Sequence, residues 1–236
     1  MRLTLVRNGF AALIATTLLL GPSTAQATVL VPGGTVAPEL LTGPAGTLLA
    51  AASNLPFDTG DVMGTLTAAV VRNAMGTLDF YYQITNDLAS IDSLSRNTNS
   101  AFALLGGPVF ATSVFFREDT GGLAEFSNGD AGAAPLTADR GMTARVVGFN
   151  FLSLPGATGI DPGETSRILV IRTNATIFIP GISSVIDGGV DSVDAFAPSS
   201  VPEPASLVLL SSAFAAAAYV TRNRRNGSRR RNRLHS

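Results

Sequence analysis

The residues from Thr77 to Thr85 alternate between mainly apolar and mainly polar side chains, and this run constrains the fold more than any other part of the chain. Successive side chains of a β-strand point to opposite faces of a sheet. A period of two therefore predicts a strand with one face in a core and the other face toward solvent. The core-facing members are expected to be Leu78, Phe80, Tyr82 and Ile84.

Further strand-like runs follow, and turn-forming residues separate them. These runs are Val62–Val71, Val109–Phe116, Thr143–Leu154, Arg167–Thr173 and Thr176–Ile179. The intervals contain Gly106-Gly107-Pro108 and Asn128-Gly129-Asp130, which are residue types that favour turns. Six to nine strands without a convincing amphipathic helix predict an all-β fold, an antiparallel β-sandwich.

The sandwich is expected over residues 56–197, a length that can bury a core without disulfides. Residues 28–55 are rich in proline, glycine, alanine and threonine and have no clear period, so they predict an extended lead-in segment or an edge strand. After the sandwich, Asp194–Ser200 is expected to be a linker or the edge of a last strand, and residues 198–206 link the domain to the C-terminal segment.

The N-terminus has the three parts of a secretory signal peptide. Arg2 and Arg7 form a positive region, Phe10–Leu20 is apolar, and Ala25-Gln26-Ala27 is a small-x-small cleavage site. Signal peptidase is therefore expected to recognise the small residues Ala25 and Ala27, and the mature chain is expected to begin near Thr28. Residues 1–27 would be removed, and an uncleaved N-terminal anchor is the alternative.

A second apolar segment, Leu207–Val220, carries no charge over its fourteen residues. As a helix it would be roughly 21 Å long, which is short for a hydrocarbon core about 30 Å thick. We expect a transmembrane helix over residues 207–221 that suits a temporary hold in the membrane. The following tail, residues 222–236, has no acid and is expected to stay cytoplasmic because of its arginines. These are Arg222, Arg224, Arg225, Arg229, Arg230, Arg231 and Arg233.

The order of a short proline motif, an apolar helix and an arginine cluster resembles the sorting signal of PEP-CTERM proteins. The motif is Val201-Pro202-Glu203-Pro204, and the resemblance covers residues 201–236. It implies recognition at the membrane by the processing enzyme exosortase, a Gram-negative bacterium that makes exopolysaccharide, and delivery to the cell surface or extracellular matrix. An ordinary single-pass membrane protein with a proline-containing stalk is the alternative.

The part between the two ends has a composition that excludes several functions. Residues 28–204 contain seven arginines and all 17 acidic residues, a net charge of −10, which argues against nucleic acid as a partner. The chain has no cysteine and no lysine, and its one histidine is His235. The exported part therefore lacks the residues of a serine–histidine triad, a Schiff-base lysine or a histidine- or cysteine-based zinc site.

Three local patterns remain as candidates. Asp187, Asp191 and Asp194 offer carboxylates on a glycine-containing stretch that would suit calcium, although a solvated hairpin turn is the favoured interpretation. Asn97–Ser100 is expected to be a polar loop, which attached surface glycans or solvation alone would explain equally well. Asn174-Ala175-Thr176 matches a glycosylation acceptor, a triplet that is also common by chance.

We therefore expect an exported, non-enzymatic surface or matrix protein with a structural, adhesive or exopolysaccharide-associated role and no cofactor. Its expected partners are exosortase, signal peptidase, the export machinery and the membrane, with exopolysaccharide as a further implied partner. The alternative is a carbohydrate-binding or hydrolytic module that uses carboxylates, with or without calcium.

Overall fold

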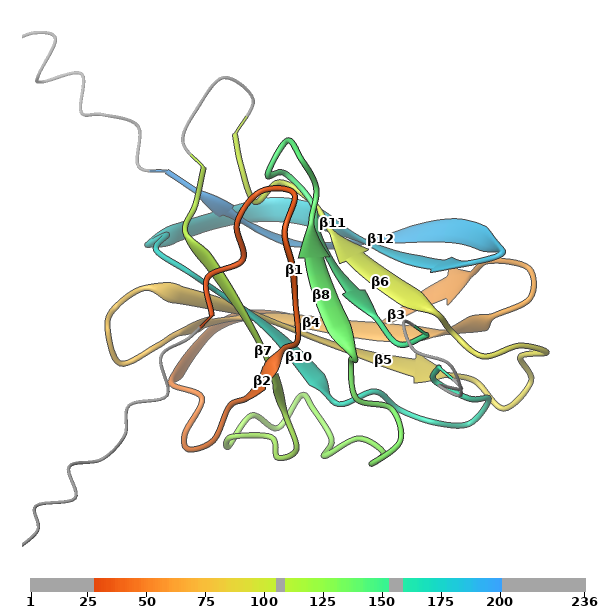
Figure 1. The fold of residues 1–236 in the computed structure, drawn as a ribbon. Coiled ribbons are helices and arrows are strands. Elements are labelled where there is room, and N and C mark those ends of the chain that lie inside the picture. The colour runs from red at the N-terminus through yellow and green to blue at the C-terminus, as the bar shows by residue number, and fades with distance from the viewer. Residues whose placement is uncertain (1–27, 105–108, 153–158, 201–236) are drawn as a thin grey trace, which may run out of the picture.

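The computed structural model describes residues 28–104, 109–152 and 159–200, which form two β-sheets packed face to face (Figure 1). These ranges contain no helix, so the all-β prediction is confirmed for them. They contain twelve strands, more than the six to nine expected. Two of the additional strands are only two residues long, and such short pairings leave no periodic signal in a sequence.

The first sheet, which we call the β5 sheet, has the strand order β2-β7-β10-β5-β4-β3. Its strands are β2 (Glu39–Leu40), β7 (Thr112–Arg117), β10 (Ile168–Thr173), β5 (Leu78–Asn86), β4 (Met63–Arg72) and β3 (Thr47–Asp58). Neighbouring strands are antiparallel except β2 and β7, which run parallel. The sheet is therefore mixed, whereas the sequence predicted an antiparallel one.

The second sheet, the β9 sheet, has the order β1-β8-β9-β6-β11-β12 and is antiparallel throughout. Its strands are β1 (Thr35–Val36), β8 (Thr137–Arg140), β9 (Val147–Asn150), β6 (Arg96–Asn99), β11 (Ile177–Asp187) and β12 (Gly189–Ser199). The run expected over Thr143–Leu154 forms a strand only at Val147–Asn150, because residues 141–146 make the turn between β8 and β9.

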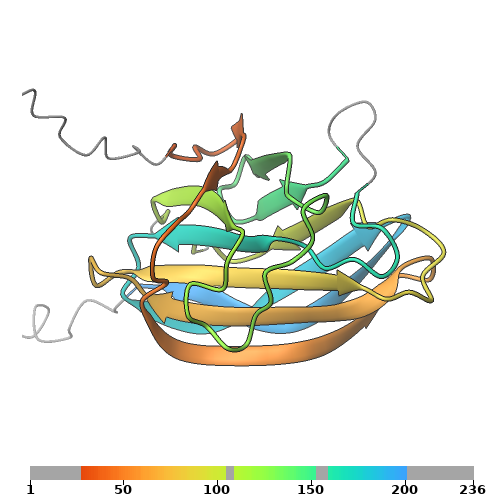
Figure 2. The same ribbon diagram turned by 90° about the horizontal axis from the view of Figure 1, so that it is seen from below.

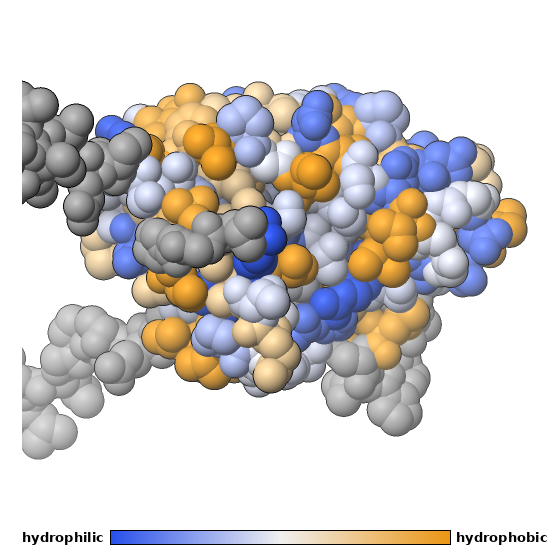
Figure 3. Space-filling model, turned by 90° about the horizontal axis from the view of Figure 1, so that it is seen from above, coloured by the Kyte–Doolittle hydropathy of each residue, from blue (hydrophilic) through white to orange (hydrophobic). Residues whose placement is uncertain are grey.

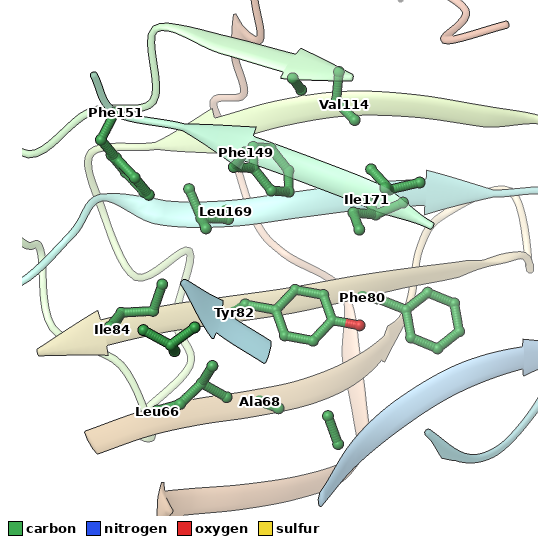
Figure 4. Close-up of a cluster of buried hydrophobic side chains, with 14 of the residues drawn as sticks. Leu66, Ala68, Phe80, Tyr82, Ile84, Val114, Phe149, Phe151, Leu169 and Ile171 are labelled. Carbon is green, nitrogen blue, oxygen red and sulfur yellow. The ribbon is translucent and has the colours of Figure 1, made fainter. Parts of the chain in front are cut away.

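The main core lies between the sheets and uses the apolar face predicted for β5. Phe80, Tyr82 and Ile84 are buried and meet Phe149 and other side chains of the opposite sheet (Figure 4). Phe80 packs edge-on against Phe102 at a ring separation of 5.5 Å. The Tyr82 hydroxyl donates a hydrogen bond to the Phe196 carbonyl at 3.1 Å, which ties the core to β12.

The other face of β5 is also buried, which corrects the prediction that it faces solvent. Asp79 and Tyr81 have no exposed surface, and Gln83 is 5% exposed. The cover is a connection between β7 and β8, residues 118–136, which lies across the β5 sheet (Figure 2). Its Leu123 and Phe126 belong to a second apolar cluster there. The alternation correctly predicts the strand. Its polar face is not exposed to solvent, because the irregular connection of residues 118–136 covers it.

Strand β12 occupies much of the stretch expected to be a turn and a linker. It pairs with β11 along its whole length, from Gly189 opposite Asp187 to Ser199 opposite Ile177. The lead-in region 28–55 likewise contains β1, β2 and most of β3, and β3 is an edge strand of the β5 sheet. The folded domain thus continues to Ser199, within two residues of the proline motif.

Candidate functional site

The predicted sorting motif and both predicted targeting segments lie outside the described residues. This applies to Ala25 and Ala27, to Val201, Pro202, Glu203 and Pro204, to the helix expected over 207–221 and to the arginines of residues 222–236. Within the described ranges, no helix has the length and apolar character needed to cross a membrane. The last described strand, β12, ends at Ser199, directly before the motif in the sequence.

The three candidate calcium ligands belong to one hairpin but do not converge. Gly188, with a φ of 63°, makes the tight turn between Asp187 and β12, so the hairpin interpretation is confirmed. Asp191 and Asp194 are three residues apart in β12 and therefore point to opposite faces. Asp191 accepts a hydrogen bond from the Asp58 backbone at 2.8 Å. Among the described residues, no group of three or more metal-ligating side chains comes together.

Most of the polar stretch expected as a loop is instead strand β6, in which alternate side chains are buried. Asn97 and Asn99 are 0% and 1% exposed. The Asn97 amide donates to the Ser183 hydroxyl at 2.9 Å and to the Ser184 carbonyl at 3.1 Å, and Asn99 donates to Asn97 at 2.8 Å. The Asn97 amide thus joins β6 to β11, whereas Asn99 bonds within β6 and its Oδ1 has no hydrogen-bond partner among the described residues. The Asn174 side chain accepts from the Ala111 backbone at 3.0 Å.

An open hollow of about 290 Å³ lies beside the turn between β8 and β9. Its lining comes from two segments far apart in sequence: Ser100, Ala101, Thr143, Arg145 and Val146. Arg145, Thr143 and Val146 are exposed side chains of the turn, and Ser100 and Ala101 follow β6. Figure 3 views the molecule from above the orientation of Figure 1 and shows polar and apolar residues interspersed over that face. We call this feature the Arg145 hollow.

A buried arginine holds the two sides of the Arg145 hollow together. Arg140, at the end of β8, is 3% exposed. It donates through Nε to the Ala144 carbonyl at 3.0 Å and through Nη2 to the Phe102 and Phe110 carbonyls at 2.9 and 3.0 Å. Its Nη1 donates to the Leu30 carbonyl at 3.2 Å. One side chain thus joins the turn, the segment after β6 and the first described residues.

The Arg145 hollow has a positive local charge within an acidic domain. Neither Arg140 nor Arg145 has a carboxylate partner among the described residues, whereas four other arginines there do. Burial lowers the pKa of Arg140, but a guanidinium remains charged in proteins near neutral pH. Two cations without paired carboxylates therefore lie at this end of the sandwich.

The backbone around the hollow is strained at two alanines. Ala101 has a φ of 67° and Ala144 a φ of 60°, a left-handed conformation that residues with a Cβ seldom adopt. Backbone strain of this kind costs about 1–3 kcal/mol and persists where the surrounding structure enforces it. Arg140 bonds to the Ala144 carbonyl and to the carbonyl of Phe102, the residue after Ala101. No pattern in the sequence signals either conformation.

A second polar cluster lies beneath the 118–136 connection and has a structural explanation. Asp79, the buried acid of the described residues, pairs with Arg172, and Gln83 bonds the connection itself. Burial raises the pKa of Tyr81 to about 12. The cluster is covered by Leu123 and Phe126, so it stabilises the fold. The Arg145 hollow, in contrast, is lined by exposed side chains, among them Thr143 and Arg145.

The fold and the hollow define an all-β, sandwich-like module with a basic recess at one end. No family model, no curated protein and no solved structure matches the chain. The functional argument therefore depends on the residues and on their arrangement.

Proposed function

We propose that this chain is an exported surface or matrix protein with a non-enzymatic, structural or adhesive β-domain that its C-terminal sorting signal delivers. The observation that carries the proposal is the short distance in sequence between fold and signal. Strand β12 ends at Ser199, and only Ser200 and Val201 separate it from Pro202. The motif therefore follows the folded domain directly in the sequence and would hold that domain close to the membrane face where exosortase would act.

Prolines give the motif a physical role in processing. Pro202 and Pro204 have no backbone N–H and disfavour helix in the residues before them. They therefore keep a helix at 207–221 from extending outward to Ser200. A processing enzyme can then grip an extended backbone, because the amides of such a segment are not already used in a helix.

The residue composition of the domain supports a non-enzymatic role. Residues 28–204 contain no histidine, cysteine or lysine, so they lack three of the side chains that serve as bases or nucleophiles in enzymes. Asp79, the buried acid of the described part, accepts from Asn73 at 2.7 Å and pairs with Arg172 at 2.9 Å. The Asp79 carboxylate is therefore already bonded to other side chains of the domain.

The proposal is tested by replacing both prolines of the motif. The Pro202→Ala/Pro204→Ala variant, expressed in a host that encodes an exosortase, should stay in the inner membrane with its C-terminus intact. Pro56→Ala is the matched control, because Pro56 is an exposed residue of the edge strand β3 and should leave sorting unchanged. Membrane fractionation and the mass of the purified chain give the readout. Normal trimming of the double variant would contradict the role assigned to the motif.

A further inference from the structure

We propose that the Arg145 hollow binds a carboxylate-bearing sugar unit, a hexuronate of an acidic polysaccharide. The inference rests on the proposed function, because export to the surface or matrix is what brings the domain into contact with polysaccharide. The site itself is argued from the geometry of five residues and the arginine that supports them.

The charge of the hollow selects an anion. Arg145 is exposed and has no ion-pair partner among the described residues, although residues 28–204 as a whole carry a net charge of −10. Arg140 adds a second positive charge, and its hydrogen-bond partners among the described residues are backbone carbonyls. A guanidinium binds a carboxylate through two parallel hydrogen bonds, a geometry that lysine cannot provide. Arg145 is therefore placed to hold the carboxylate of the ligand.

The other lining residues select a sugar rather than a simple ion. Thr143 presents a hydroxyl, and the Ser100 hydroxyl, which donates to the Ile182 carbonyl at 3.1 Å, can still accept a hydrogen bond. Ala101 and Val146 supply an apolar side for the C–H face of a ring. A volume of about 290 Å³ lies at the lower end of ligand pockets. The hollow therefore fits one sugar unit with an acid at one end.

The walls are held in place before a ligand arrives. The Gly141 amide donates to the Val146 carbonyl at 2.9 Å, and the Ala144 amide donates to the Gly141 carbonyl at 2.8 Å, which closes the turn. The Phe102 amide donates to the Arg145 carbonyl at 2.9 Å and joins the two walls. A pre-formed site loses less conformational entropy on binding. The strain at Ala101 and Ala144 is consistent with a conformation kept for binding.

The test is a titration of the mature, exported protein with glucuronate, glucose and inorganic phosphate, followed by amide NMR shifts and calorimetry. Glucuronate should bind and shift the amides of Ser100, Thr143 and Val146. Glucose lacks the carboxylate and phosphate lacks the ring, so both should bind much more weakly. Arg145→Gln should weaken glucuronate binding about tenfold to a hundredfold, the value of a charge-assisted bond.

Arg72→Gln is the matched control, because Arg72 is also exposed and unpaired among the described residues but belongs to β4. It should bind glucuronate as the unchanged protein does.

Thr143→Val is a second variant that should weaken binding while the fold is retained. Equal affinity of Arg145→Gln and the unchanged protein, equal binding of phosphate, or no glucuronate binding would each overturn the inference. A processed C-terminus in the same preparation would show that sorting holds even where sugar binding fails.

Discussion

Arg172 on β10 lies directly opposite Asp79 on β5 and closes over its buried carboxylate. The arginine donates through Nε to both carboxylate oxygens at 3.1 Å and through Nη2 to Oδ2 at 2.9 Å. Its guanidinium also stacks over the Phe115 ring, 5.1 Å from the ring centre. The pair explains how a strand with an acid on its second face can be buried on both faces.

Removing one member of this pair should destabilise the domain strongly. Arg172→Met leaves the Asp79 carboxylate buried with only Asn73 as a side-chain donor, and breaking a buried pair costs about 3–5 kcal/mol. Arg172 is itself partly exposed, so the lower end of that range is expected. Urea unfolding measures the change, and Arg72→Met serves as an exposed control that should alter stability by less than about 0.5 kcal/mol. Similar changes in the free energy of unfolding for the two variants would show that the Arg172–Asp79 pair does not stabilise the domain.

Gln83 should control how firmly the 118–136 connection covers the β5 sheet. Its amide nitrogen donates to the Ser127 and Ser166 carbonyls at 2.9 Å each, and its oxygen accepts from the Ser127 backbone at 3.0 Å. Gln83→Leu should cost about 1–3 kcal/mol because backbone groups lose their partners. Hydrogen exchange should rise at residues 123–130. Ser127→Ala, which keeps the backbone contacts, should leave exchange unchanged, and equal protection in both variants would contradict this role.

Arg140 should be required for the order of the Arg145 hollow. Arg140→Met removes the donor from four backbone carbonyls and should destabilise the domain by about 2–4 kcal/mol. Exchange should increase at residues 101–104 and 141–146. Arg145→Met changes an exposed side chain and should stay within about 0.5 kcal/mol of the original stability. If Arg140→Met leaves these amides protected from exchange, Arg140 does not hold the walls of the hollow together.

Acid should remove the contribution of the Arg96–Asp139 pair on the β9 sheet. The Arg96 guanidinium donates to Asp139 at 2.5 and 2.8 Å and holds the pKa of that carboxyl below its usual value. The folded-state pKa is lowered, so the contribution is complete above the unfolded pKa of about 3.9 and is lost as the pH falls through the folded value. Asp139→Asn should therefore cost about 1 kcal/mol at neutral pH, since both partners are partly exposed. The cost should become smaller as the pH falls below the unfolded pKa, as urea unfolding at neutral and acidic pH can show.

The sequence predicted the inner face of β5 because its alternation is regular from Leu78 to Ile84. It could not predict burial of Asp79 and Gln83, since their cover is an irregular segment that begins more than 30 residues later. The polar sequence around Asn97 and Asn99 likewise predicts a surface loop, although both side chains are buried. Whether a polar side chain can be buried depends on partners such as Ser183 on a distant strand.

The Arg145 hollow was beyond sequence reasoning for a further reason. Its walls, near Ala101 and near Thr143, are about 40 residues apart and meet only because β6 and β8 both lie beside β9. The positive φ values of Ala101 and Ala144 belong to residues that have no preference for that conformation. In contrast, the turn at Gly188 could be predicted, because glycine adopts a positive φ without strain.

The most direct test of the proposed function is the mass of the mature chain from isogenic cells with and without exosortase. We predict a chain that begins near Thr28 in both. In cells with exosortase it should end near the Pro202-Glu203-Pro204 motif, and without the enzyme it should retain its tail. A chain that still ends in His235-Ser236 in both strains would contradict the account and would leave the ordinary membrane anchor as the explanation.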